Sequence, residues 1–540
     1  MKLFLTIKRH IPFISALIIF WLTISILIVL SIRENDGHFV YPLDDPYIHM
    51  AMAKNFSKYG LWSVDRYHNF TSSSSSPLWT LLISLTYLIF GVNEITPLIL
   101  NIIFASLCLL ISYIILRKYI LSNITIFIIL FGIIFLTPLS SLTLCGLEHT
   151  LHSLLVILFL YFSSNILSVD SIHKKFEKEK IFLFIIGIFS TVTRYESLFM
   201  IFAVCFIFLL KRDFLFSFLL VIISASPFLL YGIISKVNGW AFLPNTILRK
   251  GKFPDLSSIK GIMNFLGMEA FKEIMKNPHI LTLILSILII LTIKYKKGES
   301  FWKMSNIMMF ILMILYFLHM EFAKTGWFYR YEAYLIPISI ISLSIGISYK
   351  ISEGFKLNFN KKNFLQDIPY IMLLLLIFFP LGRRGLSALC ETIQATKNIY
   401  EQQYQMGLFL KEYYNSENVA LNDIGATNFI SDIKCIDIYG LANFEIYKLF
   451  KEKKFDVINL QRIVKEKDVK IAILYESWFK LPKIWKKVGE WRIFNNVVCG
   501  DDKVSFFAVD TSEFDKLKRN LKEFSSRLPL GVVQKGEYLK

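Results

Sequence analysis

Long apolar segments recur between residues 11 and 381, and they constrain the fold more than any other feature of the sequence. The first of them, Ile11 to Ile32, runs for 22 residues without a charged side chain. A bilayer requires about 20 apolar residues for each helix that crosses it, and a soluble core requires no such series. This first segment is longer than the apolar region of a signal peptide and lacks a small-residue cleavage site, so we interpret it as an uncleaved span. The sequence therefore predicts a polytopic α-helical membrane protein.

The apolar segments predict about eleven membrane crossings. They are Ile11–Ile32, Ile95–Leu116, Ile124–Leu139, Leu151–Ile166, Ile181–Val192, Leu198–Leu210, Phe214–Ile234, Ile280–Ile293, Ile307–Leu318, Tyr334–Ile347 and Ile368–Leu381. The segment Leu78 to Gly91 has only 14 residues. This length is too short for a straight crossing, so the segment is predicted to be re-entrant or to lie on the membrane surface.

Basic residues cluster between the apolar segments and predict their orientation. The clusters are the N-terminus with Lys8 and Arg9, Arg117-Lys118, Lys174 to Lys180, Lys211-Arg212, Lys294 to Lys297, and Lys350 to Lys362. The positive-inside rule places them all in the cytoplasm, so the N-terminus is predicted inside and the C-terminal region outside. A net charge of +18 would suggest nucleic acid in a soluble protein. Here the clusters account for it, and membrane lipids rather than nucleic acid are the expected partners.

An acidic pair follows the first span, in the segment Tyr41-Pro-Leu-Asp-Asp-Pro-Tyr-Ile-His49. Pro46 suits the first turn of a helix and Asp45 suits the N-cap before it, so one interpretation of Asp45 is structural. Capping does not explain Asp44. A carboxylate just outside a membrane suits general-base or metal chemistry, and the alternative is a solvated loop acid.

Other charged motifs fall on the same predicted side. In Gly146-Leu-Glu-His149, the cost of burying a charge, about 2.5–3.5 kcal/mol, predicts that Glu148 faces a polar cavity or the interface. In Thr193-Arg-Tyr-Glu196, the two charged side chains are spaced to pair with each other. Lys250 and Arg330 stand near aromatic residues, which fits a lipid-linked phosphate and equally fits ordinary anchoring at the interface.

The tail is less apolar than the rest and is predicted to form a separate extracytoplasmic α/β or α+β domain over residues 383–540, after a transmembrane domain over residues 1–382. Predicted strands are Val419–Asn422, Lys434–Ile438, Val469–Tyr475 and Phe494–Val498, and predicted helices are Glu391–Tyr414 and Asn443–Glu452. Trp478, Trp485 and Trp491 could stack on sugar rings, although a core position is expected for at least two of them.

The cysteines and the serine run are weaker signals. The six cysteines show no CxxC motif and no His/Cys metal spacing, and a disulfide between Cys435 and Cys499 is left open. By composition, Ser72 to Ser76 is predicted to be a flexible linker.

The order of the motifs along the chain resembles that of the GT-C superfamily of membrane glycosyltransferases, in particular bacterial arabinofuranosyltransferase-like enzymes. The resemblance starts with Leu43-Asp-Asp-Pro-Tyr-Ile-His49, Ser76-Pro-Leu-Trp79 and Gly146-Leu-Glu-His149. It continues through Thr193-Arg-Tyr-Glu196, Leu243-Pro-Asn-Thr246, Tyr329-Arg-Tyr-Glu332, Asp423-Ile-Gly-Ala426 and Asp437-Ile-Tyr-Gly-Leu441. The chain departs from the pattern at Tyr195, where relatives commonly have proline, which puts the role of Arg194 in doubt.

The resemblance implies transfer of a sugar from a polyprenyl-phosphate donor, with inversion, on the outer face of a bacterial inner membrane. It implies that Asp44 is the general base and that Glu148 orients the acceptor, with Asp44, Asp45 or Glu148 holding a divalent metal if one is needed. Substrate-binding or phosphate-binding roles fall to matching residues, namely His49, Arg194, Asn245, Lys250 and Arg330. The acceptor would be an envelope glycan, lipid or protein. A lipid or polysaccharide transporter without glycosyl transfer is the rival prediction, and such a protein should show internal repeats and broken helices.

Overall fold

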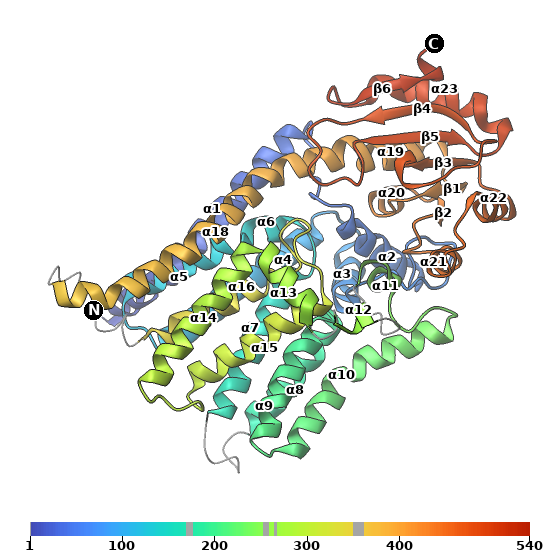
Figure 1. The fold of residues 1–540 in the computed structure, drawn as a ribbon. Helices are drawn as coiled ribbons and strands as arrows, with labels where there is room; N and C mark the ends of the chain where they lie inside the picture. Colours follow the sequence, from blue (N-terminus) through green and yellow to red (C-terminus); the bar gives the residue numbers. More distant parts are fainter. Residues whose placement is uncertain (1, 169–176, 252–258, 264–266, 349–360) are drawn as a thin grey trace.

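The computed structural model describes residues 2–168, 177–251, 259–263, 267–348 and 361–540. A bundle of helices is joined to a C-terminal domain built around a β-sheet (Figure 1). Helix α18 (Lys361–Ile399) continues across residues 382 and 383 and carries the chain from the bundle into the domain. The boundary predicted after residue 382 therefore falls within a helix, and the division into two domains stays a prediction. Residues 174–176 and 350–360 of the predicted basic clusters lie outside the described residues.

The bundle consists mainly of apolar helices with short connections. They are α1 (Lys2–Glu34), α3 (Pro77–Phe90), α4 (Thr96–Arg117), α5 (Asn123–Leu136), α6 (Leu139–Leu144), α7 (His149–Leu167), α8 (Glu177–Thr193), α9 (Ser197–Leu210), α10 (Phe214–Val237), α14 (Pro278–Lys296), α15 (Met304–Phe322) and α16 (Leu335–Gly346). Shorter or more polar helices are α2 (Asp45–Tyr59), α11 (Asn245–Lys250), α12 (Ile259–Met263) and α13 (Glu269–Lys276).

Six helices in the described part of the chain are long and apolar enough to cross a membrane. They are α4, α7, α10, α14, α15 and the Arg9–Glu34 part of α1. Each of the eleven predicted spans corresponds to a helix, although several helices are shorter than a bilayer requires, so the number of crossings stays a prediction. Large apolar side chains such as Trp21, Phe218 and Phe379 are exposed, which is expected of a surface in contact with lipid. The chain is a helical membrane protein with a sheet-containing C-terminal domain.

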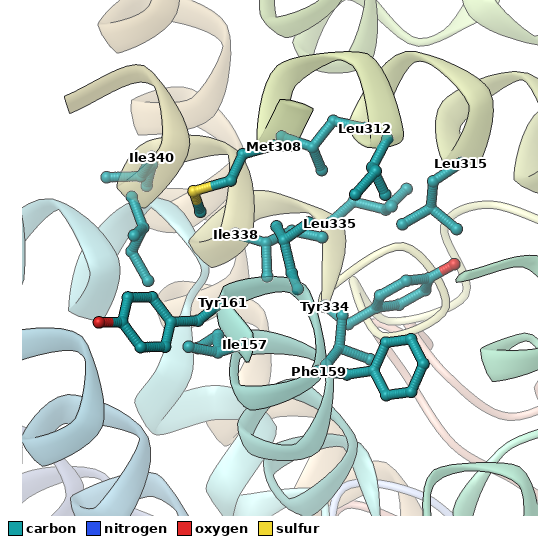
Figure 2. Close-up of a cluster of buried hydrophobic side chains, with 14 of the residues drawn as sticks. Ile157, Phe159, Tyr161, Met308, Leu312, Leu315, Tyr334, Leu335, Ile338 and Ile340 are labelled. Atoms are coloured by element: carbon teal, nitrogen blue, oxygen red, sulfur yellow. The ribbon is translucent and has the colours of Figure 1, made fainter. Parts of the chain in front are cut away.

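Helices α7, α15 and α16 form the centre of the bundle. Figure 2 shows Phe159 of α7, Leu312 of α15 and Leu335 at the start of α16 within a cluster of buried apolar side chains. Among the six long apolar helices, α7 is the most enclosed. Close packing of this kind holds helices together where lipid removes the hydrophobic driving force. Glu148 directly precedes α7, so it lies near the centre of the bundle rather than on the surface that faces lipid.

Where the structure describes them, loops predicted to be cytoplasmic lie toward one end of the bundle (Figure 1). The Tyr113 hydroxyl near the end of α4 donates to the Arg9 carbonyl oxygen at 3.1 Å, and Lys118 donates to the Tyr161 hydroxyl of α7 at 2.8 Å. The start of α2 and the C-terminal domain lie at the opposite end (Figure 1). This separation agrees with the predicted grouping of the loops, while the side of the membrane that each end faces stays a prediction.

The C-terminal domain has a six-stranded sheet in the order β2-β1-β3-β5-β4-β6. The strands are β1 (Asn418–Leu421), β2 (Lys434–Asp437), β3 (Ile471–Leu474), β4 (Lys486–Arg492), β5 (Lys503–Ala508) and β6 (Val533–Gly536). β1 pairs in parallel with β2 and with β3, and the other pairings are antiparallel. The helical elements are the π-helical turn η2 (Tyr400–Tyr404), α19 (Gln405–Tyr413), α20 (Ala426–Ile430), α21 (Phe444–Lys451), α22 (Val457–Glu466), α23 (Phe514–Phe524) and the short 3-10 turns η3 (Glu476–Trp478), η4 (Thr511–Glu513), η5 (Ser525–Arg527) and η6 (Glu537–Leu539).

The predicted strands at 419–422, 434–438 and 469–475 correspond to β1, β2 and β3. The strand predicted at Phe494–Val498 is wrong. The Asn496 side chain accepts the backbone N–H groups of Val498 and Cys499 at 3.1 and 2.8 Å, so this segment forms a turn instead. Strands β4, β5 and β6 were missed because charged residues interrupt their apolar pattern.

The tryptophans and cysteines of the domain separate by exposure. Trp485 and Trp491 are buried in its core, as expected of two of the three, whereas Trp478 is 41% exposed. Cys435 and Cys499 are both free and buried, so the disulfide left open from the sequence does not form.

The serine run is not a flexible linker. Ser72, Ser73 and Ser74 are fully or almost fully buried. The Ser73 hydroxyl donates to the Leu441 carbonyl oxygen at 3.1 Å, and the Ser72 carbonyl oxygen accepts the Asn245 backbone N–H at 2.9 Å. Composition misled the prediction because buried serines satisfy backbone groups of segments far away in the sequence.

Helix α2 joins the bundle to the C-terminal domain. Ile48 and Met52 share a buried cluster with Phe409 of α19 and Ile424. Lys54 donates to the carbonyl oxygen of Phe429 at the end of α20 at 2.8 Å. The domain therefore packs directly on the helix that follows the acidic pair.

Candidate active site

Helix α2 begins at Asp45, with Pro46 in its first turn. Asp44 occupies the N-cap position, and its side chain makes no capping hydrogen bond. The structural role considered for Asp45, that of N-cap, is therefore wrong: Asp45 is already helical, and its carboxylate is directed to other partners. Both acids of the pair are thus available for interactions away from the helix terminus.

Asp44 is held by the C-terminal domain. Its two carboxylate oxygens accept the backbone N–H groups of Gly425 and Ala426, each at 2.8 Å. A Cβ atom at position 425 would lie 2.1 Å from the Asp44 carbonyl oxygen, so this close approach requires glycine. Burial, together with the charge of Asp423, raises the pKa of Asp44 to about 8. The two N–H bonds position this carboxyl group firmly.

Asp45 is held by the bundle instead. Its carboxylate forms an ion pair with Arg330, which follows α15, and Arg330 is itself buried. The guanidinium group of Arg330 also lies over the Tyr331 ring, 5.1 Å from its centroid. The two neighbouring acids therefore face different parts of the molecule.

Glu148 and Arg194 form a second buried ion pair. The Glu148 Oε1 atom accepts Arg194 Nη1 at 2.7 Å, and Arg194 also forms two hydrogen bonds with Glu196. The predicted Arg194–Glu196 pair therefore exists within a larger network. Glu148 Oε2 is buried and has no hydrogen-bond partner in the described structure, so one acceptor atom of this side chain is unsatisfied.

Contacts of Gly146 and of Trp79 hold the segment before α7, which carries Glu148, close to the acidic pair. Gly146 has φ +70°, and a Cβ atom there would lie 2.5 Å from the Tyr41 ring and 3.2 Å from Pro46. The Trp79 indole N–H of the Ser-Pro-Leu-Trp motif donates to the Gly146 carbonyl oxygen at 3.2 Å. These contacts bring the start of α7 against the start of α2.

The loop before α16 presents Arg330 through an uncommon backbone. Gly326, Trp327, Phe328 and Tyr329 all have positive φ, which costs free energy at the non-glycine positions. Glu332 holds this loop against α18. Its carboxylate accepts the backbone N–H of Gly326 and an N–H of Arg384 in α18, each at 2.8 Å. Sequence reasoning missed Glu332 and Arg384 as positioning residues, because their partners are distant in sequence.

A cavity of about 290 Å³ lies within the bundle, and we call it the membrane cavity. Its charged and polar lining includes Asp45, His49, Glu148, Arg194, Lys324 and Arg330. Much of the remaining wall is apolar and includes Leu147, Leu198, Phe199, Phe228, Leu243, Ile247 and Phe322. Two buried guanidinium groups beside an apolar wall suit a phosphate attached to a hydrocarbon chain.

A second cavity of about 340 Å³ lies between the bundle and the C-terminal domain, and we call it the domain cavity. Its lining from the domain includes Gln403, Asn422, Asp423, Tyr439, Trp478 and Gly500. The bundle contributes Asp44, Asp45, Ile48, Lys324, Trp327 and Tyr331. Asp45, Ile48, Lys324 and Tyr331 line both cavities. The two cavities therefore meet beside Asp45.

The remaining predicted site residues, His49, Asn245 and Lys250, do not lie together. His49 lines the membrane cavity, and its Nδ1 atom lies 2.8 Å from the Thr80 hydroxyl; burial lowers its pKa. Asn245 is buried and donates to the Gly440 carbonyl oxygen at 3.1 Å, and it does not line either cavity. The side chain of Lys250 lies outside the described residues. Lys324, Tyr331 and Asp423 line the cavities and were not predicted as site residues.

The acids considered as metal ligands are already engaged. Both oxygens of Asp44 accept backbone N–H groups, Asp45 pairs with Arg330, and Glu148 pairs with Arg194. Within the described ranges, no group of three or more His, Cys, Asp or Glu side chains is placed to hold a metal ion. These three carboxylates do not fit a metal-ligand set, so no step below is assigned to a metal.

The fold, a helical bundle joined to a C-terminal sheet-containing domain, is similar to that of GT-C structures, as the sequence motifs predicted. The structure of ArnT from Cupriavidus metallidurans bound to undecaprenyl phosphate matches with a TM-score of 0.52 at 10% identity, over 91% of this chain and 98% of ArnT. The apo structure of ArnT gives the same values. At this identity the match establishes the fold.

Other comparisons are weaker. The archaeal oligosaccharyltransferase AglB from Archaeoglobus fulgidus, in complex with an inhibitory peptide and a dolichol-phosphate, gives a TM-score of 0.46 at 12% identity, over 84% of this chain and 69% of AglB. A family model described as "Domain of unknown function (DUF8728)" matches residues 397–507. None of the curated proteins compared with the chain matches it.

Proposed function

We propose that the protein transfers a sugar from a polyprenyl-phosphate donor to an acceptor hydroxyl group at the membrane surface. The observation that carries the proposal is the position of Asp45, which lines both the membrane cavity and the domain cavity. The membrane cavity, with guanidinium groups beside an apolar wall, fits the donor, and the domain cavity, with Gln403, Asn422 and Asp423 in its lining, fits the acceptor. The undecaprenyl phosphate bound by ArnT supports a lipid carrier of this class for a chain with the same fold.

In this proposal Asp45, rather than Asp44, is the general base. Asp45 accepts the proton of the acceptor hydroxyl group while the oxygen of that hydroxyl group forms a bond to the anomeric carbon of the donor sugar. The bond from that carbon to the phosphate oxygen breaks, and the polyprenyl phosphate leaves with the electron pair. A single displacement of this kind inverts the anomeric configuration.

The guanidinium groups have two roles. Arg330 and Arg194 bind the donor phosphate and stabilise the charge that develops on it as the bond breaks. Because Arg330 pairs with Asp45 before the donor is present, its movement toward phosphate releases the Asp45 carboxylate to accept a proton. The free Oε2 atom of Glu148 accepts a hydroxyl group of the donor sugar or of the acceptor and so orients it.

The proposed location is a bacterial inner membrane, with the site on the outer face and the N-terminus in the cytoplasm. The basic loops gathered at the end opposite the site support this orientation. Reporter fusions ending after Lys178 and Lys297 should be active in the cytoplasm, and fusions ending after Glu148 and Glu401 should be active outside. A cytoplasmic signal after Glu401 would contradict the orientation.

The transfer itself is tested with purified full-length protein in liposomes that contain one labelled polyprenyl-phosphate sugar at a time, with envelope extract as the acceptor. We expect label to move to a product from at least one donor, and we expect Asp45→Asn to abolish this movement while donor binding persists. Movement of a donor across the bilayer without release of polyprenyl phosphate would favour a transporter instead.

A further inference from the structure

The domain cavity lies at the carboxyl ends of the three parallel strands of the sheet. Asp423 follows β1, Tyr439 follows β2, and Trp478 follows β3. β1 lies between β2 and β3 in the sheet. The connection that leaves β1 therefore leads to a strand on one side of it, and the next connection leads to the strand on its other side. In open α/β sheets, the crevice where the connections change sides in this way is where ligands bind. The domain therefore presents a binding edge of its own toward Asp45.

Aromatic side chains form one wall of this edge. Trp478 is 41% exposed although the other two tryptophans of the domain are buried. Its ring lies against Tyr439, with centroids 5.4 Å apart, and against Tyr475, with centroids 5.0 Å apart. These contacts fix the Trp478 ring while leaving much of its surface open. A fixed, exposed indole face suits the C–H face of a sugar ring.

Polar groups stand beside this wall and are held in place. Asp423 Oδ2 accepts the Tyr475 hydroxyl at 2.5 Å and the Gln403 amide at 2.9 Å. A carboxylate positioned in this way can accept hydrogen bonds from sugar hydroxyl groups, and together with the aromatic face it matches the two surfaces of a sugar ring.

The charge of the cavity restricts the ligand further. The charged residues that line it are Asp44, Asp45, Asp423 and Lys324. Asp45 is compensated by Arg330, and burial raises the pKa of Asp44 and of Asp423, so the cavity offers its ligand carboxyl groups that exchange hydrogen bonds rather than a strong field. These groups suit the hydroxyl and amino groups of a neutral or amino sugar, whereas an acidic group would have Lys324 as its charged partner in the lining. A phospholipid headgroup or the phosphate of a lipid acceptor would place its charge beside three carboxyl groups and a single lysine.

We infer that the acceptor is a glycan whose terminal residue is a neutral or amino sugar, and that the C-terminal domain binds this residue with its ring on Trp478 and a hydroxyl group on Asp423. The reacting hydroxyl group then faces Asp45 at the junction of the two cavities. The inference rests on the proposed function for the transfer step, but the sugar site on the domain stands on its own contacts. It narrows the acceptor class from glycan, lipid or protein to glycan.

The test is binding of simple sugars to purified full-length protein in nanodiscs, measured by saturation-transfer NMR without any donor. The probes are methyl glycosides of glucose, galactose and mannose, glucosamine, glucuronic acid and glucose 6-phosphate. We expect at least one neutral or amino sugar to bind through its C–H face, and the two acidic sugars to bind at least several-fold more weakly. Binding should fall roughly tenfold in Trp478→Ala, as for loss of an aromatic anchor, and recover in part in Trp478→Phe.

Matched variants separate this inference from the proposed function. Phe494→Ala, which removes another exposed aromatic side chain of the same domain, should leave sugar binding unchanged, and Asp45→Asn should retain it while transfer is lost. Sugar binding that is equal in Trp478→Ala and in the unaltered protein would overturn the inference, as would tighter binding of the acidic sugars. Transfer to a peptide or a lipid in a protein that binds no sugar would overturn it while leaving the proposed function intact.

Discussion

The two cavities that meet at Asp45 are built in different ways. The membrane cavity is apolar, and its charges come in buried ion pairs, Asp45 with Arg330 and Glu148 with Arg194. The domain cavity is less apolar, and two of its acids are held by neutral donors: Asp423 by Tyr475 and Gln403, and Asp44 by backbone N–H groups. At the first cavity a donor phosphate must replace the carboxylate partners of Arg330 and Arg194, whereas at the second Asp44 and Asp423 are held without a guanidinium partner.

The same difference separates the contacts of the two neighbouring acids, Asp44 and Asp45. Asp44 and Asp45 are adjacent in sequence, yet one is fixed by backbone N–H groups of the C-terminal domain and the other by a guanidinium group of the bundle. Asp44 thus fastens the domain beside the site, and in the proposed function Asp45 accepts the proton. The predictions below alter one side of the comparison at a time.

The largest effect is expected from Asp45→Asn. The amide retains the shape of the side chain but cannot accept the acceptor proton, so transfer should fall by about 10²- to 10⁴-fold, the usual contribution of a general base. Donor binding should change little. The measurement is the initial rate of label transfer in liposomes. If Asp44→Asn loses as much activity while its domain stays docked, the assignment within the pair is reversed.

Arg330→Ala should have the next largest effect, on donor binding. Removing one partner of a buried charge pair costs about 2–5 kcal/mol, and here it also removes a phosphate ligand. Arg330→Lys should recover only part of the affinity because lysine lacks the planar fork that binds two phosphate oxygens. Affinity is measured with a fluorescent polyprenyl phosphate. Arg66→Ala, which breaks a surface ion pair with Asp432, is the matched control.

The sequence motifs named more of the residues that line the membrane cavity than of those that line the domain cavity. Asp45, Glu148, Arg194 and Arg330 stand in short motifs at the ends of apolar segments, where charge is unusual enough to be informative. The same patterns located the helices, because a bilayer demands long apolar segments whatever packs around them.

The domain side was harder to predict because its contacts are long-range. Nothing near Asp44 in sequence indicates that N–H groups of Gly425 and Ala426 bind it, and the choice between the two acids depends on that contact. Capping rules favoured a structural role for Asp45 for the same reason, since they consider only neighbours along the chain. The exposure of Trp478 follows from the sheet order, which composition does not reveal.

Gly425→Ala should loosen the domain from the bundle. The added Cβ atom would lie 2.1 Å from the Asp44 carbonyl oxygen, so the α2–α20 contact must shift, at an expected cost of about 1–3 kcal/mol. The midpoint of thermal unfolding should fall and protease cleavage between bundle and domain should increase. Gly382→Ala, where an added Cβ atom meets nothing within 4 Å, should show neither change. Equal behaviour of the two variants would mean that the contact at Asp44 contributes little.

The smallest effect concerns the pH dependence of stability. Burial raises the pKa of Asp44 from 3.8 to about 8, so the folded protein binds a proton that the unfolded chain releases. The contribution of this group is therefore fully present below about pH 4 and declines as the pH rises toward 8, with a slope of at most about 1.4 kcal/mol per pH unit. Asp44→Asn cannot ionise, so its unfolding midpoint should vary less with pH between 5 and 8 than that of the unaltered protein. Asp45→Asn serves as the control, since it leaves the carboxyl group of Asp44 and its two N–H partners in place. A parallel pH profile in Asp44→Asn and the unaltered protein would show that Asp44 is ionised in the folded state, so that the domain is held by a charged carboxylate.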